Sequence, residues 1–64
     1  MKEYDVVKAK RDLSTKVHKN CVGTIVMVYD NPRLAYEVEF FDENNETIDV
    51  ITVEPEDLVP DDSV

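Results

Sequence analysis

Side chains branched at the β carbon constrain this chain more than any other feature. It holds eleven Val, three Ile and four Thr, against only two Ala and three Leu. Such residues lose side-chain freedom in a helix and pack well on the pleated surface of a sheet. The 64 residues are enough for one hydrophobic core and too few for two. The sequence therefore predicts a single small all-β domain.

The order of the expected elements is that of an SH3-like five-stranded barrel. We expect strands over residues 4–9, 24–29, 35–41 and 47–53, followed by a short last strand at Val59. The polar, basic residues 10–20 predict a long loop after the first strand, with an irregular helical turn after Ser14 left open. Pro55 at its first position predicts a short 3-10 turn before the last strand. The barrel would occupy residues 1–59, and residues 60–64 would form a short acidic C-terminal tail.

The second strand and its hairpin partners give sharper expectations. The apolar run 24–29 predicts a strand buried on both sides or one that curls around a barrel. Gly23, the only glycine, predicts a bulge or a close backbone approach at the start of this strand.

The third and fourth strands each carry an alternating set of residues that should face the core. These sets are Tyr36, Val38 and Phe40 on one strand and Ile48, Val50 and Thr52 on the other. A two-residue loop at Asn44 and Asn45 would place Phe40 opposite Asp49 and turn the second set outward. We therefore expect an odd-length loop or a bulge in this hairpin.

Charge is distributed unevenly along the chain. Residues 1–20 hold six Lys or Arg and three acids, a net +3, whereas residues 21–64 hold Arg33 and twelve acids, a net −11. A solvated surface that serves solubility alone is one interpretation. The other is an acidic face that binds a basic protein, because complementary potentials speed association and suppress wrong partners. Binding of nucleic acid is disfavoured, since it requires a basic footprint.

The residues expected to contact such a partner surround the third strand. Glu37, Glu39 and Phe41 share one face by alternation, and an exposed aromatic beside acids is typical of a protein-binding hot spot. The alternative is that the curl of the barrel buries Phe41. The remaining acids of the predicted site are Asp49, Glu43 and Glu46.

The sequence gives little support for a catalytic site or a metal site. His18 and Cys21 are the only His and Cys, and a barrel of this size can hardly enclose a pocket for them. The acidic segment 42–46 has Thr47 where a calcium loop has its sixth-position glycine. We expect no enzyme activity, no metal and no cofactor.

Four segments carry a resemblance to a known family. They are Glu-Tyr-Asp-Val-Val at 3–7, Val-Gly-Thr-Ile-Val at 22–26, Ala-Tyr-Glu-Val-Glu-Phe at 35–40 and Thr-Val-Glu-Pro-Glu-Asp-Leu at 52–58. Over residues 3–58 the chain resembles a family of short bacterial SH3-like proteins classed only as a domain of unknown function. It is more distantly similar to the small barrel of the nitrile hydratase β-subunit. The resemblance implies a stand-alone interaction module, which neutralises or assembles with a protein encoded nearby as antitoxin or immunity proteins do.

Three binding functions follow, in decreasing order of support. The first is an inhibitor of the antitoxin or immunity type that masks a basic partner with its acidic face. The alternative is an accessory or assembly barrel of a larger enzyme, joined through edge strands. The last is a nucleic-acid-binding barrel that uses Lys8, Lys10, Arg11, Lys16 and Lys19.

The expected location is the cytoplasm. One cysteine can form no intrachain disulfide, and the acidic start at residues 1–5 is unlike a signal peptide. The longest apolar stretch has five residues, against about 20 in a membrane-spanning helix, so we expect no membrane association.

Overall fold

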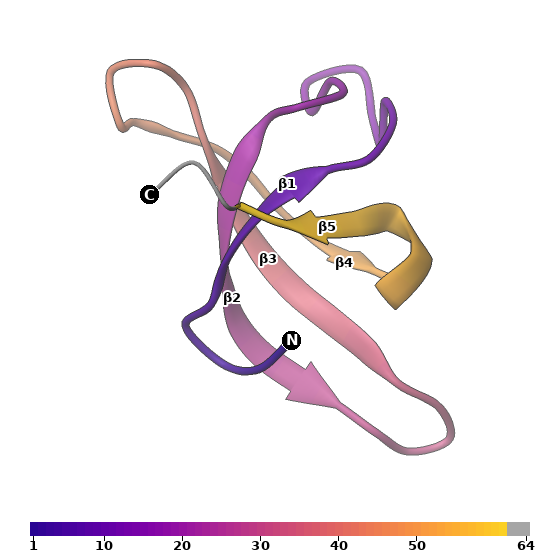
Figure 1. Ribbon diagram of the computed structural model, residues 1–64. Helices are drawn as coiled ribbons and strands as arrows, with labels where there is room; N and C mark the ends of the chain where they lie inside the picture. Colours follow the sequence, from indigo (N-terminus) through magenta and orange to yellow (C-terminus); the bar gives the residue numbers. More distant parts are fainter. Residues whose placement is uncertain (62–64) are drawn as a thin grey trace.

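A computed structural model describes residues 1–61 and shows five antiparallel strands in a single sheet (Figure 1). The strands follow the order β4-β3-β2-β1-β5, which leaves β4 and β5 at the two edges. This confirms the all-β, barrel-like class, with a long loop after the first strand and a 3-10 turn before the last. The elements are β1 (Val6–Ala9), β2 (Val22–Tyr29), β3 (Ala35–Phe41), β4 (Thr47–Val53), the 3-10 helix η1 (Pro55–Asp57) and β5 (Leu58–Pro60).

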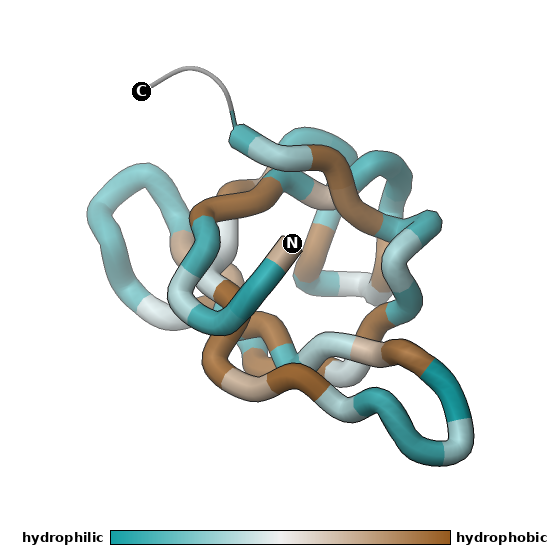
Figure 2. The backbone as a smooth tube through the Cα atoms, turned by 60° about the horizontal axis from the view of Figure 1, so that its bottom comes forward, coloured by the Kyte–Doolittle hydropathy of each residue, from teal (hydrophilic) through white to brown (hydrophobic). Residues whose placement is uncertain are grey.

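The core lies on the inner face of this curved sheet. Apolar stretches alternate with hydrophilic turns along the chain (Figure 2). Val17, from the loop over residues 10–21, also reaches the core and is fully buried. The Ser14 hydroxyl accepts the Val17 N–H at 3.0 Å, and this local turn takes the place of the helical turn considered from the sequence. The buried apolar residues are Val7, Ala9, Val17, Ile25, Tyr36, Val38, Phe40, Val53 and Leu58.

Gly23 is needed for a close approach between β2 and β3. It pairs with Phe40, and a Cβ atom on it would lie 2.7 Å from Val38 Cγ1 and 2.9 Å from the Glu39 carbonyl oxygen. The carbonyl belongs to the backbone and cannot rotate away. The predicted close backbone approach is therefore confirmed.

The first strand is shorter than predicted. It begins at Val6, because Tyr4 has a left-handed backbone with φ of 71° and cannot continue a strand. The Tyr4 N–H donates to the Ile25 carbonyl at 2.6 Å, which still holds this segment beside β2.

The interpretation of β2 as a strand buried on both sides is wrong. A bulge between Ile25 and Met27 shifts its pairing with β3, and the strand then continues beyond the core. Met27, Val28 and Tyr29 are 50%, 37% and 40% exposed. Only the first half of the apolar run therefore packs in the core.

The β3–β4 hairpin has both an odd-length loop and a bulge, which were expected as alternatives, and their effects on the strand register cancel. Its loop over residues 42–46 is odd in length, and a bulge follows between the Phe40–Asp49 and Phe41–Thr47 pairs, where Ile48 is the extra residue. One shift reverses the other, so Phe40 does lie opposite Asp49.

The inner face of β4 was consequently predicted wrongly. Val53 is 5% exposed and Ile51 packs against the core, whereas Val50 is 45% exposed. The residues expected inside, Ile48, Val50 and Thr52, do not belong to the buried core.

A buried carboxylate fastens the loop after β1 to η1. The Asp57 carboxylate accepts the Glu54 N–H at 3.0 Å and the Arg11 Nε–H at 3.1 Å. Burial opposes ionisation of Asp57, but these hydrogen bonds and the Arg11 charge outweigh it and hold the pKa of Asp57 below its usual range.

The C-terminal boundary lies later than predicted. Pro60, assigned to the tail from the sequence, pairs with Val7 in β5, and the Asp61 N–H donates to the Val6 carbonyl at 3.1 Å. The rest of the predicted tail, residues 62–64, lies outside the described residues. Across residues 1–61, no helix has the length and apolar character needed to span a bilayer.

Candidate functional site

The side of the sheet opposite the core, here called the outer face, brings together residues from four strands. Val7 and Ala9 point inward, so Val6 and Lys8 point outward, and the pairing extends this face across the sheet. Its cross-strand rows are Val6–Thr24–Glu39–Val50, Lys8–Val22–Phe41–Thr47 and Met27–Glu37–Thr52.

Exposed apolar side chains gather on this face. Nine large apolar residues are exposed among those described, and five of them lie here. Tyr29 joins the set because it lies two positions beyond Met27 on the same strand. Exposed apolar residues that gather on one face can mark an interaction site, so the outer face is the candidate binding surface. The five residues and their exposed fractions are Val6 (41%), Val22 (38%), Met27 (50%), Tyr29 (40%) and Val50 (45%).

Two carboxylates stand in the middle of this apolar surface and are held by neutral donors. The Thr52 hydroxyl donates to Glu37 and the Thr47 hydroxyl donates to Glu39, each at 2.5 Å. Neither glutamate forms an ion pair with another described residue. Their orientation is therefore fixed from β4, while their negative charge stays uncompensated.

The predicted binding residues fall into three groups. Glu37, Glu39 and Phe41 do share the outer face, where Phe41 is half-buried. Asp49 is separated from them, because it pairs with the inward-pointing Phe40 at the β4 edge. Its carboxylate accepts the Val50 N–H at 2.9 Å.

The other two predicted acids lie at the end of the β3–β4 hairpin. Glu43 and Glu46 are exposed in the turn over residues 42–46. Asp42 organises this turn, since its carboxylate accepts the Asn44 N–H at 2.8 Å and the Glu46 N–H at 3.0 Å. The turn acids therefore form a second acidic region beyond the strand that carries Glu37 and Glu39.

The sequence prediction missed Lys8 and the apolar residues of the face other than Phe41. Val6 and Lys8 could have been found by extending the alternation of Val7 and Ala9. Met27 could not, because the bulge before it reverses the alternation of β2.

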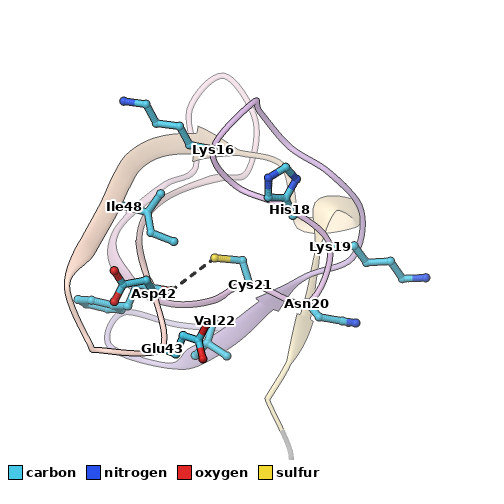
Figure 3. Close-up of a pocket in the computed structure, with 10 residues that line it drawn as sticks. Lys16, His18, Lys19, Asn20, Cys21, Val22, Asp42, Glu43 and Ile48 are labelled. Carbon is cyan, nitrogen blue, oxygen red and sulfur yellow. Dashed lines mark hydrogen bonds between the residues drawn. The ribbon is translucent and has the colours of Figure 1, made fainter.

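A groove of about 410 Å³ lies at one end of the outer face, between the loop after β1 and the 42–46 turn, and Val22 and Phe41 of the outer face also line it (Figure 3). The side chains of Cys21 and Ile48 point into it, while those of Lys16 and Lys19 extend away. Burial, and next the Asp42 charge, raise the pKa of the Cys21 thiol. Its Sγ lies 3.5 Å from the Phe41 carbonyl. His18 lines the same groove, but the raised pKa disfavours the thiolate that a nucleophile needs.

Four of the basic residues considered for nucleic-acid binding have different surroundings. Lys8 lies on the outer face, Arg11 is paired with Asp57, and Lys16 and Lys19 border the groove. Within residues 1–61, no group of three or more His, Cys, Asp or Glu is placed to hold a metal ion.

Comparison with known families identifies the family of this chain. It belongs to the family described as "Domain of unknown function (DUF4926)", whose model matches residues 3–60. The resemblance to a domain of unknown function is thus confirmed. No curated protein and no solved structure matches the chain.

Proposed function

We propose that this protein is a non-catalytic binding module whose outer face binds a basic protein partner. It acts as a bacterial, cytoplasmic inhibitor of the antitoxin or immunity type, on a partner encoded nearby. By covering basic residues that the partner needs for its own substrate, the module keeps that partner inactive.

One observation carries the proposal: two oriented, uncompensated carboxylates lie within an exposed apolar surface on strands. Charged groups give a complex its specificity and its association rate, and apolar groups around them exclude water. Strands hold these groups more rigidly than loops would, which lowers the entropic cost of binding.

The arrangement also describes the partner. Glu37 and Glu39 are two residues apart on β3, so their Cα atoms are separated by roughly 7 Å. A partner that offers two Lys or Arg side chains at a similar spacing can engage both carboxylates. Met27 pairs with Glu37 and Val50 pairs with Glu39, so each carboxylate has an apolar neighbour to shield the contact from water.

The test is affinity capture from a lysate of the source cell, followed by binding measurements on the protein retained. We expect one stoichiometric basic protein whose affinity falls steeply as the ionic strength rises. Glu37→Lys/Glu39→Lys should abolish its binding, and Glu37→Gln/Glu39→Gln should weaken it while keeping acceptors for Thr52 and Thr47.

The matched control is Glu43→Lys/Glu46→Lys, which makes the same change in net charge in the 42–46 turn. We expect it to weaken binding only through the general change in charge. If this turn variant loses the partner and the Glu37/Glu39 variant retains it, the acidic turn is the binding site and the outer face is not.

A second candidate function rests on β4, an edge strand of seven residues. An accessory or assembly barrel could join a larger enzyme by adding a strand of its partner to this edge. Such a joint would respond little to salt, so the same capture in low and high salt separates the two functions.

A further inference from the structure

The outer residues of β2 form an uncharged spine along the whole strand. They are Val22, Thr24, Met27 and Tyr29, and three of these four are at least 38% exposed. The spine lies at the middle of the outer face, because β2 pairs with β1 on one side and with β3 on the other.

The two sides of this spine carry opposite charge. Lys8 lies on the β1 side, in no ion pair with any other described residue. Glu37 and Glu39 lie on the β3 side. A surface with a neutral centre, one positive flank and one negative flank is complementary to itself under a two-fold rotation about that centre.

We propose that a second copy of this chain covers the outer face, related to the first by a two-fold axis along β2. The spines of the two copies pack against each other. The β1 flank of each copy then faces the β3 flank of the other, and Lys8 of each copy reaches Glu39 of the second. This contact forms twice, so one favourable pair implies the other.

The charge pattern gives Lys8 an acidic counterpart that a purely basic protein lacks. A basic partner satisfies Glu37 and Glu39 and is repelled by Lys8, whereas a second copy pairs Lys8 with Glu39 in both contacts. A domain this small also buries a modest fraction of its surface by itself, so covering the spine stabilises it.

This inference rests on the outer face of the proposed function and adds its regulation. The second copy and the basic partner compete for the same residues. Self-association therefore keeps the face covered until a partner with more positive charge displaces it. The self-association can be tested without any partner.

The experiment is sedimentation equilibrium of the purified protein, from micromolar to millimolar concentration. The wild type should show a monomer–dimer equilibrium. Lys8→Glu and Glu39→Lys should each weaken the dimer about tenfold, because each replaces two attractive contacts with two repulsive ones. An equimolar mixture of the two variants should recover the wild-type affinity, since both contacts of the mixed dimer are again attractive.

Further variants test the spine and control for charge and folding. Met27→Glu places a carboxylate at its most exposed position and should leave a folded monomer by circular dichroism. Lys16→Glu and Glu43→Lys make the same charge changes away from the outer face and should leave the dimer unchanged.

Three results would overturn the inference. They are a wild type that stays monomeric at millimolar concentration, a dimer that Lys8→Glu and Met27→Glu leave intact, and variants whose mixture regains no affinity. None of these results contradicts the proposed function. That function is contradicted if the captured partner binds the Glu37→Lys/Glu39→Lys variant as tightly as the wild type.

Discussion

The two faces of the same sheet differ in what their apolar residues do. On the inner face Val7, Ile25, Val38 and Phe40 are fully buried. On the outer face Val6, Val22, Met27 and Val50 keep 38% to 50% of their surface exposed. Neighbouring residues of one strand thus have different surroundings: the inner ones stabilise the core, and the outer ones are the residues that we propose to bind a partner. Substitutions on the two faces should therefore separate the loss of folding from the loss of binding.

The largest effect is expected from a pair of adjacent phenylalanines that point to opposite faces. Phe40→Ala removes the largest fully buried side chain and should lower the free energy of unfolding by about 3–5 kcal/mol. Phe41→Ala, on the half-buried outer side, should cost about 1–2 kcal/mol. Urea denaturation measures both, and equal losses would show that the two faces contribute alike to stability.

Gly23→Ala tests the close approach inside the sheet. The added methyl group would meet Val38, Phe40 and the Glu39 carbonyl at 2.7 to 2.9 Å. We expect a loss of about 1–3 kcal/mol from overpacking, measured by thermal or urea denaturation. Ala35→Gly, at the exposed end of the same hairpin, is a control that should cost less. A Gly23→Ala protein as stable as the wild type would mean that β2 and β3 can move apart freely.

Asp57 should make stability depend on pH in a predictable direction. Its pKa in the folded protein lies below the usual range, so its contribution is complete above about pH 4 and is lost as the pH falls through the lowered value. Asp57→Asn should cost about 1–2 kcal/mol at neutral pH, with little difference from the wild type in strong acid.

The control for Asp57 is Glu56→Gln, at an exposed carboxylate of the same turn. Denaturation curves from neutral to acid pH should show no such loss for this variant. If Glu56→Gln abolishes the pH dependence and Asp57→Asn does not, the assignment of the effect to Asp57 is wrong.

The smallest effect on stability is expected from the outer carboxylates. Glu37→Gln and Glu39→Gln should each change the free energy of unfolding by less than about 0.5 kcal/mol, because both groups are partly exposed and keep an acceptor for their threonine. A larger loss in urea denaturation would place these glutamates among the residues that hold the fold.

The inner face was the part most open to prediction from the sequence. The alternation in Ala35–Phe41 predicts that strand with its observed bounds, and Gly23 predicts the close approach. The inward face of β4 was predicted wrongly, because one extra loop residue and one bulge residue compensate each other in the register. No sequence pattern distinguishes that case from a hairpin with only one of them.

The outer face was predictable only in its β3 residues, Glu37, Glu39 and Phe41. The alternation in β3 identifies Glu37 and Glu39, but their threonine donors depend on the register of β4. The exposure of Met27 and Tyr29 depends on the bulge in β2, which carries the strand past the core. Asp49 was assigned to this site because its strand was expected in the opposite orientation.

The central claim is that the outer face, and not the turn or the groove, binds the partner. It is tested most directly by adding the captured partner to the isotope-labelled protein and mapping the changes in its amide resonances. We expect changes centred on Met27, Glu37, Glu39 and Val50, and their loss in Glu37→Lys/Glu39→Lys. Changes confined to residues 42–46 and to the groove around Cys21, with the outer face unaltered, would contradict it.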